Sequence, residues 1–170
     1  MAAVNCKGAD FCRLSEEILS RGASLRFRAQ GNSMGPFIRD GDILVIAPIV
    51  DVSHVQPGDV ILFRQGARVL AHRLLSRRGD GGQTLRVKGD AHIKPDPPLR
   101  ADRVLGKVTS VERAGRTVDL ERRIVRLAAL WLWSTPPFVG SRAYALWRAA
   151  RRTLVRAAHL VVGSGPFRSC

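Results

Sequence analysis

The chain has 170 residues, a formal net charge of +14 and a sequence pI near 11.4. Hydrophobic residues make up 45% of it and charged residues 25%, which predicts a packed domain and excludes an intrinsically disordered chain. The cysteines, Cys6, Cys12 and Cys170, form no CxxC pair. Their spacing argues against a disulfide framework and a zinc site, and it indicates a reducing compartment.

Residues 1–23 are expected to form one amphipathic helix. Apolar residues recur at helical spacing between Asp10 and Leu19, Asp10 is suited to the N-cap, and Gly22 to the stop. The segment has no apolar core of signal-peptide length, and no window of the chain reaches the ~18 to 20 apolar residues of a membrane span. We therefore expect a cytoplasmic protein, with peripheral membrane association as the alternative.

Residues 24–120 are expected to form an all-β module. Short segments rich in Val, Ile and Leu are separated by Gly, Asp or Pro, which is the pattern of short strands. About seven strands are predicted, in the segments SLRFRAQG, DILVIAP, DVILFRQG, RVLAHRLLSRR, TLRVKGD, VLGKVTSVERAG and RTVDLE.

Residues 121–170 are expected to form a basic extension with a pair of amphipathic helices, so that the predicted fold class is mainly β with helices at both ends. From Glu121 onward there are nine arginines and one acid. The helices either pack on the module as a solvated pair or lie on an anionic membrane surface, with aromatic residues at the level of the headgroups. No recognised nucleic-acid-binding motif is present, so nucleic acid is not an expected partner.

Three residue types in the β module form a potential catalytic set. A serine hydroxyl needs a base to take its proton, histidine suits that task, and a carboxylate fixes the histidine tautomer. Ser33 stands in a turn rich in Gly, Asn and Pro, His72 in a later strand, and Asp90 and Asp96 in or after a KGD sequence. Residue order alone gives this set little weight, because the module holds many acids.

Alternative interpretations exist for several positions. Ser33 taken alone is typical of a turn. His92 is a rival base, and so is Lys88, since a desolvated lysine can also accept a proton. Asp42 and Asp59 each follow a glycine and are interpreted as turn formers at strand starts.

Five ordered sequence blocks resemble the type I signal peptidases, which share the S24/S26 peptidase superfamily with the self-cleaving SOS repressors. The blocks span roughly Phe27 to Val111 and read GNSMGPFIRDGDILVI, VQPGDVILFR, AHRLL, LRVKGDAHIKPD and VLGKV. In that family they correspond to the serine turn, a second G-D, the base, K-G-D and a closing G-K. The resemblance implies a serine endopeptidase on a signal-peptidase-like or SOS-repressor-like β module, with no cofactor and no metal.

The resemblance also implies roles for individual residues. Most bacterial signal peptidases and the repressors use a lysine base. The endoplasmic-reticulum, archaeal and spore-associated branch instead has a histidine in an H-R dipeptide, as in His72-Arg73 here. It implies Ser33 as the nucleophile and His72 as the base. Asp96 is the favoured orienting acid, and Asp90 is either a second partner or a turn former.

The turn around the serine is expected to bind the substrate carbonyl. The resemblance implies an oxyanion hole of backbone N–H groups in the turn of Asn32, Ser33 and Met34. Met34 and Pro36 are assigned to substrate binding, with packing under the site as the alternative role of Met34. A peptide or preprotein substrate would lie extended along an exposed strand edge.

The chain departs from the family upstream of Ser33. Type I signal peptidases carry an N-terminal membrane anchor and the repressors a DNA-binding domain, whereas one helix and one strand are predicted here. We therefore expect a soluble or peripheral peptidase that cuts a dedicated, exposed peptide. Two other classes stay open: a catalytically degenerate peptide-binding module on the same scaffold, and a basic adaptor for a membrane surface or nucleic acid.

Overall fold

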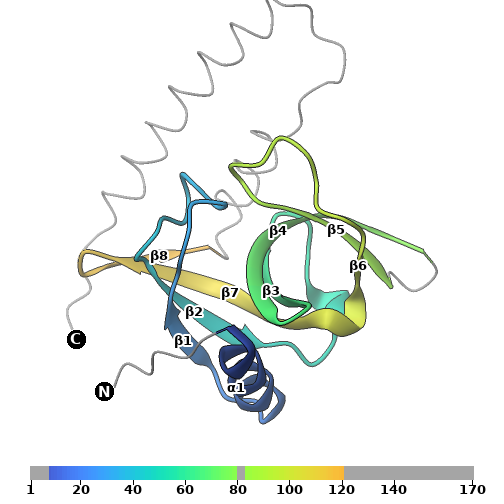
Figure 1. The fold of residues 1–170 in the computed structure, drawn as a ribbon, viewed down its shortest axis with the longest axis horizontal. Coiled ribbons are helices and arrows are strands. Elements are labelled where there is room, and N and C mark those ends of the chain that lie inside the picture. The colour runs from blue at the N-terminus through green and yellow to red at the C-terminus, as the bar shows by residue number, and fades with distance from the viewer. Residues whose placement is uncertain (1–7, 80–82, 121–170) are drawn as a thin grey trace, which may run out of the picture. The chain divides into compact units, whose positions relative to one another are not determined.

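The computed structural model describes residues 8–79 and 83–120 (Figure 1). These residues form a mainly β structure with one α-helix at its start, as the sequence predicts. The elements are α1 Gly8–Ser20, β1 Leu25–Arg28, β2 Ile43–Pro48, η1 Val52–His54, β3 Val60–Gln65, β4 Arg68–Arg78, β5 Thr84–Lys88, β6 Leu99–Arg100, η3 Ala101–Arg103, β7 Val104–Arg113 and β8 Arg116–Asp119.

The strands form one antiparallel sheet in the order β1-β2-β7-β3-β4-β5-β6, with β8 also paired to β7. The long strand β7 connects the two parts of the sheet, because Val108 pairs with Ile46 of β2 on one side and with Val60 of β3 on the other. Figure 1 shows β7 crossing the module between β1–β2 and the β3–β4 hairpin.

The seven predicted segments all contain strands, and β6 is an eighth that the sequence analysis missed. Its two residues follow Pro97 and Pro98 and pair with Thr84 and Leu85 of β5. A strand this short has no alternating pattern of its own, and the preceding prolines favour a loop assignment.

Strand β3 separates two hydrophobic cores. Val60 and Leu62 belong to the core beneath α1, whereas Ile61 and Phe63 belong to a second core with β4, β5 and Leu99. All four β3 side chains are at most 1% exposed. A strand buried on both faces carries a continuous apolar run, which is why the sequence reads VILF here. Strand β4 pairs along the whole length of this buried strand.

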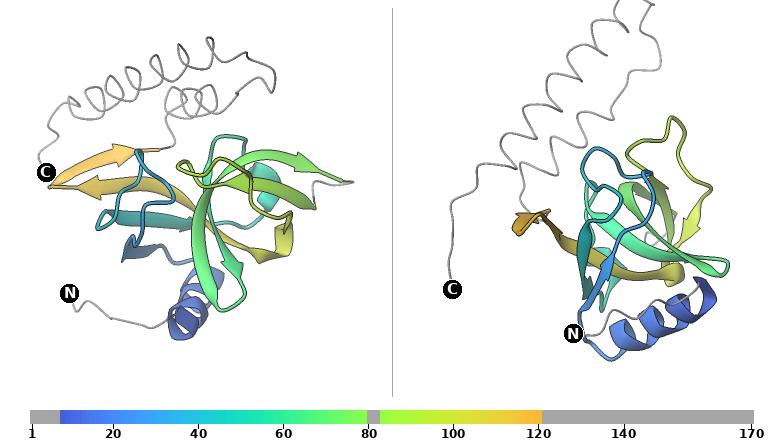
Figure 2. Two further views of the ribbon diagram at one scale, coloured as in Figure 1. Left: turned by 45° about the horizontal axis from the view of Figure 1, so that its top comes forward. Right: turned by 60° about the vertical axis from the view of Figure 1, so that its left-hand side comes forward.

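Helix α1 lies against the sheet and covers the first core (Figure 2). Its buried residues are Cys12, Ser15 and Leu19. Gly106 of β7 makes the close packing possible, because a Cβ there would lie 2.6 Å from Cγ2 of Ile46 and 3.3 Å from Cδ1 of Leu19. The glycine of the VLGKV block is thus explained mainly by its close contact with β2, where the backbone oxygen of Ala47 would also lie 2.8 Å from a Cβ, and to a lesser degree by the helix.

The two helices expected in residues 121–170 lie outside the described residues, so that part of the fold stays a prediction. Within residues 8–79 and 83–120, no helix is long and apolar enough to cross a bilayer.

Candidate active site

Ser33 lies in the loop between β1 and β2, which is held at both ends by aspartates. The carboxylate of Asp40 accepts a hydrogen bond from the backbone N–H of Gly31 at 2.7 Å, and that of Asp42 accepts one from the N–H of Arg39 at 2.7 Å. Beneath the loop, Met34 is 4% exposed and belongs to the first core. The turn residues and the buried methionine together hold the half-buried Ser33 at a defined position.

Asp42 also ties this loop to β7. Its carboxylate accepts from Nε of Arg113 at 2.8 Å, and Arg113 additionally donates to the carbonyl of Phe37 at 3.0 Å. Burial raises the pKa of the Asp42 carboxyl, but the hydrogen bonds from Arg113 and from the Arg39 N–H outweigh burial, so the net pKa is below its ordinary value. The interpretation of Asp42 as a turn residue agrees with this structural role.

The hydroxyl of Ser33 lies 3.2 Å from Nε2 of His72. His72 is in the middle of β4, opposite Ile61 of β3, and is 3% exposed. Its other ring nitrogen, Nδ1, is hydrogen-bonded to Oδ2 of Asp96. The hydroxyl, the imidazole and one carboxylate therefore form a continuous hydrogen-bonded chain.

Asp96 reaches the imidazole from the loop between β5 and β6. Its backbone N–H donates to the carbonyl of Val87 at 3.0 Å, and its side chain is 14% exposed. A carboxylate on Nδ1 favours the tautomer with the proton on that nitrogen. The lone pair of Nε2 then faces the Ser33 hydroxyl.

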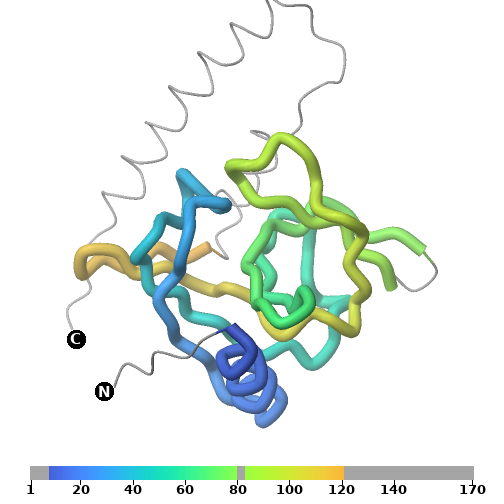
Figure 3. The backbone as a smooth tube through the Cα atoms, viewed as in Figure 1, coloured from blue at the N-terminus to red at the C-terminus, as the bar shows by residue number. Residues whose placement is uncertain are grey.

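The loop after β5 also contacts the serine loop directly, and Figure 3 shows the two loops approaching each other. The N–H of Ala91 donates to the carbonyl of Ser33 at 2.8 Å, and the N–H of Asp90 contacts Sδ of Met34 at 3.4 Å. Gly89 permits this approach, since a Cβ there would lie 2.7 Å from the Ser33 carbonyl oxygen and 3.2 Å from Nε2 of His72. The KGD glycine is therefore part of the site's geometry, a role that the sequence analysis missed.

Asp90, the second proposed acid, is bonded to Arg73 instead of the imidazole. Nε and Nη2 of Arg73 donate to its two carboxylate oxygens at 2.9 and 2.6 Å, and Nη1 donates to the carbonyl of Gly58 at 2.6 Å. The guanidinium also lies over the ring of Phe37, 5.2 Å from its centroid. Both charged side chains are 1% exposed, so this ion pair connects β4, both loops and the turn before β3 in the interior.

The rival bases occupy different positions. His92 is 45% exposed, and its ring contacts that of His72 edge-on, with centroids 5.3 Å apart. Lys88 is buried in β5 and pairs in register with Arg73. His54 is exposed in η1, whereas His159 lies outside the described residues.

The turn residues assigned to substrate and oxyanion binding differ in exposure. Asn32 is exposed and its carbonyl accepts from the N–H of Gly35 at 3.1 Å, whereas Ser33 and Pro36 are half-buried. The side chain of Met34 faces the core, so only its backbone is available to a ligand at the surface.

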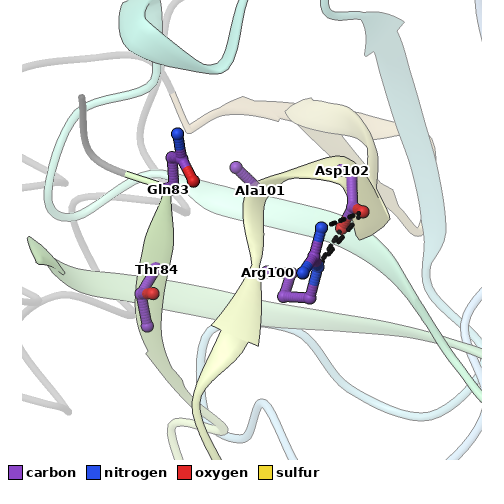
Figure 4. Close-up of a pocket in the computed structure, with 5 residues that line it drawn as sticks. All are labelled: Gln83, Thr84, Arg100, Ala101 and Asp102. Carbon is purple, nitrogen blue, oxygen red and sulfur yellow. Dashed lines mark hydrogen bonds and ion pairs between the residues drawn. The ribbon is translucent and has the colours of Figure 1, made fainter. Parts of the chain in front are cut away.

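A separate pocket lies away from these residues, beside β5, β6 and η3 (Figure 4). It is lined by Gln83, Thr84, Arg100, Ala101 and Asp102. Its guanidinium and carboxylate are paired with each other, Nη2 of Arg100 lying 3.0 Å from Oδ2 of Asp102. None of the Ser33, His72 and Asp96 side chains borders it.

A hydrogen-bonded serine, histidine and aspartate on an antiparallel β module define a scaffold of the serine-peptidase class. The chain matches the Peptidase S24-like family over residues 3–107, which is more than half of its length. It therefore belongs to that family, which confirms the S24/S26 superfamily that the sequence blocks predict. No curated protein matches the chain.

Proposed function

We propose that the protein is a serine endopeptidase similar to type I signal peptidase, which cleaves an extended peptide or preprotein segment. The observation that carries the proposal is the 3.2 Å distance between Oγ of Ser33 and Nε2 of His72, with Asp96 on the opposite nitrogen. A base within hydrogen-bond reach of a serine hydroxyl is the first requirement of this chemistry.

In the proposed mechanism, Oγ of Ser33 attacks the scissile carbonyl carbon while its proton passes to Nε2 of His72. The imidazolium is stabilised by Asp96 and then protonates the leaving amine, which breaks the peptide bond and leaves an acyl ester on Ser33. Water, deprotonated by the same imidazole, attacks the ester carbonyl, the bond to Oγ breaks, and the imidazolium returns the proton to Oγ of Ser33 as the carboxylic acid product is released. Asp96 stays ionised throughout and holds the ring in one tautomer.

The developing oxyanion needs hydrogen-bond donors beside Oγ. We assign this role to the backbone N–H groups of Ser33 and Met34, because the loop contacts of the Ser33 carbonyl and the Met34 side chain fix the orientation of this backbone. Such a preorganised turn needs no rearrangement as charge develops.

A substrate strand has a suitable edge next to the nucleophile. Strand β1 stands at one end of the strand order. Within the described residues it pairs with β2 along one edge, and no strand pairs with its opposite edge. The chain continues from β1 directly into the Ser33 loop. A peptide added along β1 would therefore be led towards Oγ in an extended conformation.

Peptide cleavage tests the proposal. Wild type, Ser33→Ala, His72→Ala and Asp96→Asn are incubated with a set of Ala-x-Ala-type peptides, and products are identified by mass spectrometry. We expect cleavage by wild type and losses of at least ~10³-fold in the first two variants. The exposed His54→Ala variant is the matched control and keeps wild-type activity. Activity that survives both Ser33→Ala and His72→Ala would refute the assignment.

An acylating probe separates an enzyme from a degenerate peptide-binding module on the same scaffold. A fluorophosphonate should label Ser33 in wild type, and labelling should fall in His72→Ala because the base no longer activates the hydroxyl. A folded wild type that neither labels nor cleaves would favour the binding module.

A further inference from the structure

One carboxylate in the site stands between two imidazoles. Oδ2 of Asp96 is bonded to Nδ1 of His72, and Oδ1 of the same group lies 3.8 Å from Nδ1 of His92. The proposed mechanism uses His72 and Asp96 but gives His92 no task. His92 is nevertheless packed edge-on against the His72 ring.

These three side chains present ligand atoms that all lie within 4.8 Å of one another. Two ligands on one tetrahedral zinc ion stand roughly 3.4 Å apart, given metal–ligand bonds of about 2.0 to 2.1 Å. The distances between the ligand atoms must therefore shorten when zinc binds. His92 is 45% exposed and Asp96 14% exposed, so His92 has the most freedom to rotate towards the other two ligands. The group is thus close to a three-ligand arrangement with solvent access.

The backbone of Gly89 lies close to one ring nitrogen of each histidine. A Cβ at this position would lie 2.9 Å from Nδ1 of His92 and 3.2 Å from Nε2 of His72. A side chain at residue 89 would collide with the His92 ring, so the approach of the two imidazoles at this point depends on glycine.

We propose that His72, His92 and Asp96 bind a divalent transition-metal ion, zinc in particular, and that the ion switches the peptidase off. Two imidazoles and a carboxylate suit zinc, and the neighbouring cobalt and nickel ions, better than magnesium or calcium, which prefer oxygen ligands alone. The ion is an inhibitor in this proposal and supplies no chemistry to the reaction.

The ion would inhibit the enzyme in either case, whether it binds Nε2 or Nδ1 of His72. A metal on Nε2 takes the lone pair that must accept the proton from Ser33. A metal on Nδ1 displaces the hydrogen bond to Asp96 and removes the tautomer that exposes the Nε2 lone pair. Because His92 has no role in the proposed proton transfer, it is the ligand that distinguishes metal binding from catalysis. The inhibitory part of the inference rests on the proposed peptidase function.

The test uses the full chain after treatment with a chelator, and zinc alone as the probe. Isothermal titration calorimetry is carried out on wild type, Ser33→Ala, His92→Gln and the control His54→Gln, each checked for folding by circular dichroism. We expect one zinc ion per chain at this site in wild type, Ser33→Ala and His54→Gln, and at least tenfold weaker binding in His92→Gln. Equal zinc affinity in wild type and His92→Gln would overturn the site.

Cleavage assays then test the consequence, with each protein compared with its own metal-free rate. Zinc should inhibit wild type, a chelator should restore activity, and His92→Gln should need at least tenfold more zinc for the same inhibition. Active wild type that binds zinc through His92 without losing activity would overturn the inhibitory role.

The two proposals fail in different ways. Binding to Ser33→Ala requires no activity, so an inactive protein that binds zinc through His92 would refute the peptidase function and leave the metal site standing. An active protein whose zinc affinity is unchanged by His92→Gln would refute the metal site and leave the peptidase function standing.

Discussion

The guanidinium of Arg73 donates two hydrogen bonds to the carboxylate of Asp90, and both side chains are 1% exposed. The same guanidinium bonds the carbonyl of Gly58 and covers the ring of Phe37. Because the backbone N–H of Asp90 also contacts Met34 beneath the serine, the ion pair joins the supports of Ser33 and His72. Asp90 is thus placed to hold the site together from inside.

Asp90→Asn should destabilise the fold strongly. Removing one charge of a buried pair leaves the other uncompensated, which costs about 3 to 5 kcal/mol in free energy of unfolding. Urea unfolding measures this, with Asp102→Asn as the matched control because its ion pair with Arg100 is exposed and should matter little. Wild-type stability in Asp90→Asn would show that the pair is not needed for the fold.

Asp96→Asn should show the opposite behaviour, with a large loss of activity and a small change in stability. An amide can donate to Nδ1 and so favour the wrong tautomer, which costs on the order of 10³ to 10⁴ in kcat. Steady-state cleavage rates and urea unfolding are measured on the same preparation. A mainly destabilised variant with near-wild-type kcat would assign Asp96 a structural role.

Gly89→Ala should reduce activity while the protein stays folded. The added Cβ would lie 2.7 Å from the Ser33 carbonyl oxygen and 3.2 Å from Nε2 of His72, so the two loops must move apart. A displacement of about 1 Å at the reacting atoms can lower kcat about 100-fold. Cleavage rates are compared with those of Gly8→Ala, where the nearest atom to the new Cβ is 3.6 Å away. Equal activities in the two variants would show that the approach at Gly89 is not critical.

Much of the fold is predictable because local pattern and burial agree. The alternating and apolar segments become strands, and the helix from Gly8 to Ser20 agrees with its apolar periodicity. The order of strands in the sheet is not predictable in this way. Strand β7 lies between β2 and β3, and no local sequence pattern encodes such a long-range pairing. The same holds for β6, which consists of two residues whose pairing depends on β5.

The sequence blocks indicated the serine, the histidine and both aspartates, and they favoured Asp96 as the acid that orients His72, but they did not indicate that Asp90 pairs with Arg73. The signal was present: Arg73 is a charge within the apolar strand VLAHRLL, and a buried arginine requires an acidic partner. Asp90 directly follows the strand segment TLRVKGD and was therefore the natural candidate for the acidic partner of Arg73. The approach of Gly89 to Ser33 had no such signal, because it depends on how two distant loops meet.

The stability of the serine loop should depend on pH through Asp42. The hydrogen bonds from Arg113 and the Arg39 N–H outweigh burial and lower the pKa of this carboxyl below its ordinary value of 3.8. A carboxyl with a lowered pKa in the folded state contributes its full stability above the unfolded pKa. That contribution is lost as pH falls below about 4 and through the folded pKa.

We therefore expect the difference in free energy of unfolding between wild type and Asp42→Asn to be largest near neutral pH and to shrink below pH ~4. Urea unfolding at several pH values measures it. In an Arg113→Gln background the guanidinium is absent, so the same comparison should depend less on pH, since the main hydrogen-bond partner that lowers the pKa has been removed. A pH-independent difference in the wild-type background would mean that the charge of Asp42 does not stabilise the loop.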